Sequence, residues 1–146
     1  MQDHEHAQRT RRSQYRYLFN AKHHGGGTSS DACWSPQLGE NEEFAVFDTA
    51  DWHDLSDERQ WLYGILRNTE GALTDLGTWN QQVAEFPFAS AGQVWHGYPL
   101  WAVSELAPQN RRGEKYRPAK EVLDKMKSAG LITSSQRKRL LKGDHA

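Results

Sequence analysis

One histidine and three charged residues that follow it have the side-chain types of a phosphoryl-transfer site. His96 lies in an aromatic segment, and Arg111, Arg112 and Glu114 follow on a basic stretch. Cleavage of RNA by its own 2′-hydroxyl needs a proton acceptor, a proton donor and a cation beside the phosphoryl oxygens. Imidazole, carboxylate and guanidinium groups supply these roles. No spacing rule makes the set specific, so these four are candidate catalytic residues of a metal-independent nuclease.

The aromatic segment spans residues 86–101, FPFASAGQVWHGYPLW. It is too apolar for a solvated linker, and its prolines and glycines break helical structure. We expect a buried or half-buried turn against which other elements pack. Trp95, Tyr98 and Trp101 flank the histidine, and such rings stack on unpaired bases in RNA-binding proteins. They are the candidate aromatic contacts.

A metal or cofactor site is not predicted. Asp48, Asp51, His53 and Asp54 lie close together, but zinc sites need closely spaced thiolate or imidazole pairs, and Mg²⁺ or Ca²⁺ sites need more oxygen ligands around a glycine turn. Carboxylates just before a predicted helix are explained by capping and by the helix dipole. The run Gly25-Gly26-Gly27 lacks the lysine and the preceding strand of a phosphate-binding loop.

Charge is segregated along the 146 residues, although the formal net charge is only −1. Residues 31–58 contain nine acidic and no basic residues, whereas residues 111–142 contain eleven basic and three acidic ones. A basic end of this kind suggests a polyanionic partner. The alternative is that the acidic and basic segments pair with each other inside the fold.

The C-terminal segment predicts two short helices joined by a tight turn. Ala119 to Ala129 forms the first helix, with Gly130 as its C′ residue. Thr133 and Gln136 have the Thr-x-x-Gln spacing of a capping box that opens the second helix. Such a hairpin can present one helix to a nucleic acid, with basic side chains neutralising phosphates. The candidate nucleic-acid contacts are Lys115, Arg117, Arg137, Lys138, Arg139 and Lys142.

Apolar residues between 59 and 86 recur at three- and four-residue spacing, which predicts one long amphipathic helix from about 57 to 85. Short strands are expected near residues 43–48 and 100–104. The predicted fold class is α+β, mostly helical, with this central helix, the aromatic turn and the C-terminal helical hairpin. Residues 1–30 are expected to be a flexible basic arm, in part helical, with a glycine-rich loop. Residues 31–146 are expected to form a single globular domain.

The combined features favour a small intracellular, non-enzymatic binding protein that engages nucleic acid or a protein partner. The basic hairpin and the aromatic turn would make the contacts, and the nuclease centred on His96 is the alternative. A cytoplasmic location is expected because Cys33 has no cysteine to pair with and no apolar signal segment or membrane span is evident. The oligomeric state is left open.

Overall fold

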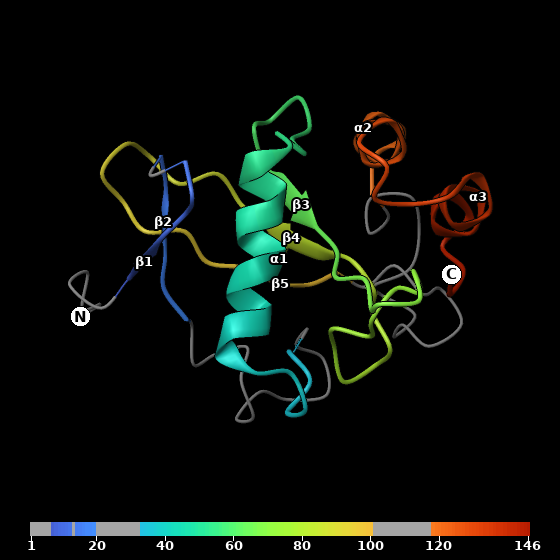
Figure 1. The fold of residues 1–146 in the computed structure, drawn as a ribbon. Coiled ribbons are helices and arrows are strands. Elements are labelled where there is room, and N and C mark those ends of the chain that lie inside the picture. The colour runs from blue at the N-terminus through green and yellow to red at the C-terminus, as the bar shows by residue number, and fades with distance from the viewer. Residues whose placement is uncertain (1–6, 13, 20–32, 101–117) are drawn as a thin grey trace, which may run out of the picture.

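The computed structural model describes residues 7–12, 14–19, 33–100 and 118–146 (Figure 1). This part of the chain forms three short helices and two small antiparallel sheets. The helices are α1 (Glu40–Trp52), α2 (Lys120–Ser128) and α3 (Ser134–Lys142). One sheet pairs β1 (Gln8–Arg9) with β2 (Arg16–Tyr17), and the other has the order β3 (Leu62–Gly64), β4 (Ala84–Phe86) and β5 (Tyr98–Pro99). The prediction of a mostly helical fold with a long central helix is therefore wrong.

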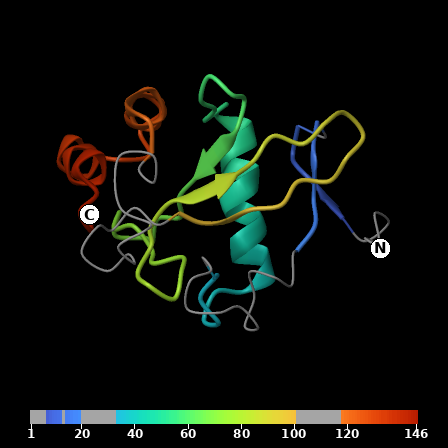
Figure 2. The ribbon, with the colours of Figure 1, turned by 180° about the vertical axis from the view of Figure 1, so that it is seen from behind.

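Helix α1 lies at the centre and packs against β3 of the three-stranded sheet. The β1–β2 hairpin lies on one side of α1, and α2 and α3 lie on the other (Figure 1). Seen from behind, α1 again lies between the β1–β2 hairpin and the α2–α3 pair, and β3 and β4 lie in front of it (Figure 2). The two ends of this layered arrangement are therefore separate surfaces.

The long helix predicted over 57–85 is replaced by β3, a series of turns and β4. Positive backbone φ angles at Gln60, Gly71 and Asn80 interrupt any helix in this range. Gly64 allows β3 to pack closely against α1, because a Cβ atom at this position would lie only 2.7 Å from the Cγ1 of Val46. The three- to four-residue spacing of the apolar side chains instead reflects two buried strands joined by compact turns.

The segment predicted as a strand at 43–48 lies inside helix α1, so that prediction is also wrong. The helix begins after Gly39, whose backbone N–H donates to the Glu42 side chain at 3.0 Å. Glu40, Glu42 and Glu43 stand in its first turn, where the helix dipole favours negative charge. The start of a helix thus explains part of the acidic composition of this segment.

Phe47 of α1 is the centre of the aromatic core. Its ring is fully buried. The ring centroid lies 5.0 Å from those of Tyr17 and Phe86, and 5.7 Å from that of Trp95. Tyr17 belongs to β2 and is only 1% exposed. The described part of the predicted N-terminal arm is therefore a β-hairpin joined to the core, where a helix was expected.

The aromatic segment, predicted to be a buried or half-buried turn, is buried only in part: Phe86 and residues 94–100 are buried or half-buried, whereas Phe88 and residues 90–93 are exposed. Val94 and Trp95 are 5% and 1% exposed, and the Trp34 indole donates to the carbonyl of Gly97 at 3.0 Å. The segment also supplies Phe86 to β4 and Tyr98 to β5. Leu100 lies in no strand, and the remainder of the strand predicted at 100–104 falls outside the described residues.

The C-terminal helical hairpin is present, with α2 packed against α3. Gly130 takes a left-handed φ of 75° directly after α2, which fits its predicted C′ role. The capping box is also confirmed. The Thr133 hydroxyl accepts from the Gln136 N–H at 3.1 Å, and the Gln136 side chain accepts from the Thr133 N–H at 2.8 Å.

Candidate functional site

Three cations of helix α3 form an open basic surface. Lys138, Arg139 and Lys142 line a hollow of about 360 Å³ together with Ser135 and Asp144. No ion pair or hydrogen bond joins these three side chains to any other described residue. We call this set the α3 cationic surface.

The local sequence of α3 explains why these cations face solvent. Leu140 is 2% exposed and anchors the helix to the core cluster, as does Ile132 just before it. Gly143 ends the helix with a left-handed φ of 78°. Cations in the last turn also stabilise a helix by complementing its dipole, which accounts for Arg139 and Lys142 but not for Lys138.

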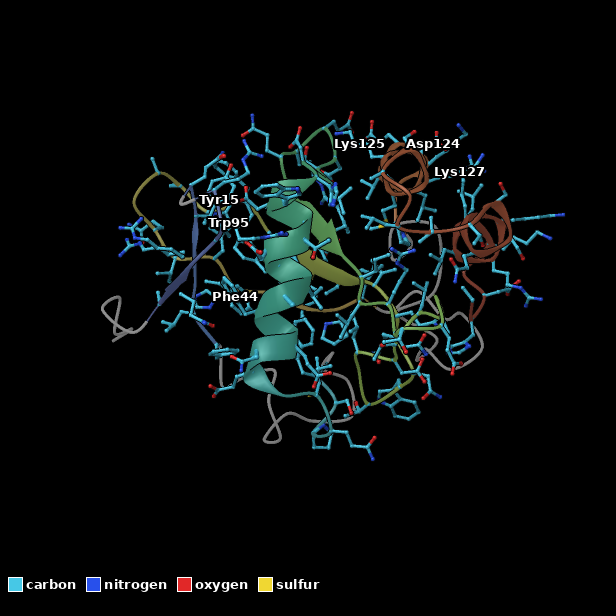
Figure 3. The ribbon with its side chains drawn as sticks, viewed as in Figure 1. Tyr15, Phe44, Trp95, Asp124, Lys125 and Lys127 are labelled. Atoms are coloured by element: carbon cyan, nitrogen blue, oxygen red, sulfur yellow. The ribbon has the colours of Figure 1, made fainter. Side chains whose placement is uncertain are left out.

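Three other basic side chains of the hairpin are already engaged, whereas Lys127 is exposed and has no partner among the described residues. Lys120 and Arg137 both bind Asp124, at 2.9 and 2.6 Å. These bonds, first that from Lys120 and then that from Arg137, hold the pKa of Asp124 below its usual value. Lys125 donates to the carbonyl of Ser56 at 2.9 Å. Asp124, Lys125 and Lys127 all project from α2 (Figure 3). Of the predicted nucleic-acid contacts, Arg137 is therefore engaged in an internal ion pair with Asp124.

The acidic 31–58 block finds its partners elsewhere. Arg11 binds Asp48 through its Nε and its backbone N–H, and the Arg12 side chain donates to the carbonyl of Asp51 at 2.8 Å. The Tyr17 hydroxyl donates to Glu43 at 2.6 Å. Within the described ranges, no salt bridge connects this block to the cations of α2 or α3. The internal pairing that would neutralise the C-terminal cations is therefore not seen in this part of the chain.

His96 is half-buried beside the N-terminal hairpin. Its Nδ1 lies 2.9 Å from the carbonyl oxygen of Leu18. A carbonyl only accepts, so Nδ1 carries a proton and Nε2 is the basic nitrogen of the neutral ring. Trp95, a predicted base-stacking residue, is instead almost fully buried in the core. Arg111, Arg112, Glu114, Lys115, Arg117 and Trp101 lie outside the described residues.

A polar network that the sequence analysis missed lies on the side of the sheet away from α1. Tyr63, Glu85 and Tyr98 are direct partners across β3, β4 and β5, so they form one row. The Tyr98 hydroxyl lies 2.6 Å from one Glu85 oxygen, and the Tyr63 hydroxyl lies 2.9 Å from the other. The Tyr63 hydroxyl also lies 2.9 Å from Asp57 and 2.8 Å from an Arg59 nitrogen. We call these five residues the tyrosine–carboxylate network.

The network is buried enough to change the proton affinities of its members. Burial, followed by the negative charge of Glu85, raises the pKa of Tyr63 well above its usual value. Tyr63 is therefore a neutral hydrogen-bonding group and not a nucleophile. Sequence spacing does not identify the network, because a turn at residues 58–59 and a positive φ at Gln60 separate Asp57 and Arg59 from β3.

Asp57 gives the network a testable pH dependence. Burial opposes its charged form, but hydrogen bonds from Arg59, Tyr63 and backbone N–H groups outweigh burial and lower its pKa. A lowered pKa adds stability that is present above the unfolded value of about 3.9 and is lost as pH falls through the folded value. Asp57→Asn is expected to lose about 1–2 kcal/mol at pH 7, because an amide nitrogen would face Arg59.

The difference between wild type and Asp57→Asn should shrink as pH falls below about 4, where the carboxylate of the unfolded wild type takes up a proton, and should vanish once the folded carboxyl is protonated as well. Urea denaturation at pH 7 and pH 3 measures both values. A difference that stays constant across this range would show that the charge of Asp57 does not contribute.

Among the residues that the structure describes, no group of three or more His, Cys, Asp or Glu side chains is placed to hold a metal ion. None of the described helices combines the length and the apolar character needed to cross a bilayer.

Comparison with known proteins adds no further assignment. The chain matches no protein-family model, no curated protein and no solved structure. The site must therefore be interpreted from its own geometry.

Proposed function

We propose that this protein is a small nucleic-acid-binding protein that contacts phosphates through the α3 cationic surface. The observation that carries the proposal is the set of three neighbouring cations, Lys138, Arg139 and Lys142, which line an open hollow and have no partner among the described residues. Phosphate groups are the ligands that such clusters of lysine and arginine neutralise, and neutralisation releases the counterions of the nucleic acid.

Two further observations support this proposal over internal neutralisation. Two carboxylates of the acidic block, Asp48 and Glu43, are bound by Arg11 and Tyr17 of the N-terminal segment. Asp124, an acidic residue of α2, is held by Lys120 and Arg137. A cytoplasmic location is part of the proposal, since Cys33 is buried and is the single cysteine of the chain, as expected where thiols are kept reduced.

Removing the three cations together should weaken binding and reduce its salt dependence. Each phosphate contact changes the slope of log K against log salt by about 0.7 to 0.9. The variant Lys138→Ala/Arg139→Ala/Lys142→Ala should therefore have a slope smaller by about 2 to 3, and an affinity lower by on the order of 100-fold near 0.1 M salt. Fluorescence anisotropy with labelled single-stranded RNA and duplex DNA, over a series of salt concentrations, measures both quantities.

The matched control is Arg67→Ala/Lys120→Ala/Lys127→Ala, which removes the same charge from other exposed positions. It should retain most of the affinity. Equal losses in the two variants would show that binding follows net charge and not the α3 surface. No binding by the wild-type protein to either nucleic acid would overturn the proposal and leave recognition of a protein partner to be tested by cross-linking.

The same reactions test the alternative, a nuclease centred on His96 with Arg111, Arg112 and Glu114. In the neutral ring, the bond from Nδ1 to Leu18 makes Nε2 the nitrogen that would accept a proton in such a reaction. The length of the nucleic acid after incubation is read on a denaturing gel. Cleavage by the wild type that disappears in a folded His96→Ala variant would favour the nuclease over simple binding.

A further inference from the structure

A second pocket lies at the opposite end of the molecule from α3. It opens between the β1–β2 hairpin and the turn at residues 89–93, and its volume is about 400 Å³. Pockets for small ligands have volumes of this order. Figures 1 and 2 both place the β1–β2 hairpin on the far side of α1 from α2 and α3. We call it the hairpin pocket.

Two arginines in this pocket are placed unfavourably for the protein alone. Arg9 on β1 and Arg16 on β2 are direct partners across the antiparallel pair, and both line the pocket. Like charges directly opposite on one sheet repel each other and destabilise the pair. Arg16 donates to the carbonyl of Gly92 at 2.9 Å, and Arg9 has no partner among the described residues. No described carboxylate lines the pocket, so an anion between the two guanidinium groups would relieve this repulsion.

The same pocket has an aromatic wall. Tyr15 is half-buried, and its ring centroid lies 4.8 Å from that of Trp95 at an interplanar angle of 48°. The two rings lie side by side next to the β1–β2 hairpin (Figure 3). Trp95 is 1% exposed and packs against Tyr15, so Tyr15 is the ring available to a ligand. The aromatic segment thus contributes to a pocket, although Trp95 within it belongs to the core.

The remaining polar groups suit a planar ligand with donors and acceptors on its edge. Gln14 and Gln93 are both exposed and both line the pocket. Each amide offers two donors and one acceptor oxygen. The Gln93 backbone N–H donates to the carbonyl of Ser90 at 2.9 Å, and Gly92 adopts a left-handed φ of 82°, so a tight turn positions this side of the pocket.

We propose that the hairpin pocket binds a nucleoside phosphate. The phosphate would lie between Arg9 and Arg16, since guanidinium groups bind phosphate oxygens in a bidentate manner. The base would stack on Tyr15, with its polar edge toward Gln14 and Gln93. This site is separate from the α3 cationic surface and does not depend on nucleic-acid binding there.

The test is calorimetric titration of the full chain with adenosine 5′-monophosphate, adenosine and inorganic phosphate. The monophosphate should bind at least tenfold more tightly than adenosine or inorganic phosphate, because only it engages both the arginines and the aromatic wall. A mononucleotide that binds no better than inorganic phosphate would overturn the assignment of a base subsite. Absence of heat from all three ligands at millimolar concentration would overturn the site.

The variant Arg9→Gln separates a binding role from a structural one. It should weaken the monophosphate at least tenfold, while the thermal midpoint of the free protein stays equal or rises because the like-charge repulsion is removed. Arg67→Gln, an exposed charge outside the pocket, is the matched control and should bind as the wild type does. Unchanged affinity in Arg9→Gln would contradict the proposal. Because this variant leaves α3 intact, its binding to long nucleic acids should persist, which distinguishes failure of one site from failure of the other.

Discussion

Phe47→Ala is expected to lower the free energy of unfolding by about 3–5 kcal/mol, a large part of the stability of a domain this size. The ring is fully buried and lies against the rings of Tyr17, Phe86 and Trp95. Removing it leaves a cavity among residues from three separate parts of the chain, which cannot all close in. Urea denaturation followed by circular dichroism measures the loss.

Phe47→Leu is the matched control, because leucine refills most of the volume and should cost only about 1–2 kcal/mol. The proposed arrangement of the aromatic core would be contradicted if the alanine variant lost less than about 1 kcal/mol. In that case α1 would not be the element on which the N-terminal hairpin and the aromatic segment meet.

Glu85→Leu is expected to cost about 3 kcal/mol, although leucine is close in size and apolar. Glu85 accepts from the Tyr98 hydroxyl, and it shares the single hydroxyl proton of Tyr63 with Asp57. A hydrogen bond to a charged group contributes about 1.5–3 kcal/mol, and a buried donor left without a partner carries its own desolvation cost. Glu85→Gln keeps an acceptor oxygen and should lose about half as much.

Chemical denaturation of the two Glu85 variants beside Glu121→Leu gives the comparison. Glu121 is exposed on α2, so its loss should change stability by no more than about 0.5 kcal/mol. If Glu85→Leu proved as stable as the wild type, the tyrosine–carboxylate network would not contribute to holding β3, β4 and β5 together.

The parts of the fold that were predictable from sequence depend on neighbouring residues only. The capping box of Thr133 and Gln136 and the left-handed Gly130 involve positions within four residues of each other, and both are present in the structure. The α3 cations were identified for the same reason, since helical spacing fixes which side chains share a face. The pairing of Arg137 with Asp124 was not, because it requires the packing of α2 against α3.

The sheet was missed because its evidence is distributed along the chain. Leu62–Gly64 pairs with Ala84–Phe86, and each strand alone is too short to show alternation above the helical spacing around it. The prediction of a strand at 43–48 was wrong because local signals just before it favour a helix. Gly39 is the N-cap of α1, and acidic residues occupy the first turn. The tyrosine–carboxylate network and the hairpin pocket both depend on strand register, which the sequence alone does not determine.

The attachment of the N-terminal hairpin to the aromatic segment also has a consequence for how the protein folds. Leu18 and His96 are 78 positions apart in the chain, and the backbone of residues 16–18 is hydrogen-bonded to Trp95 beside them. Closing so long a loop costs entropy before the contacts can repay it, and contacts of this range slow folding. The α2–α3 hairpin needs no such closure. We therefore expect the two proposed sites to mature at different times, the α3 surface early and the hairpin pocket last.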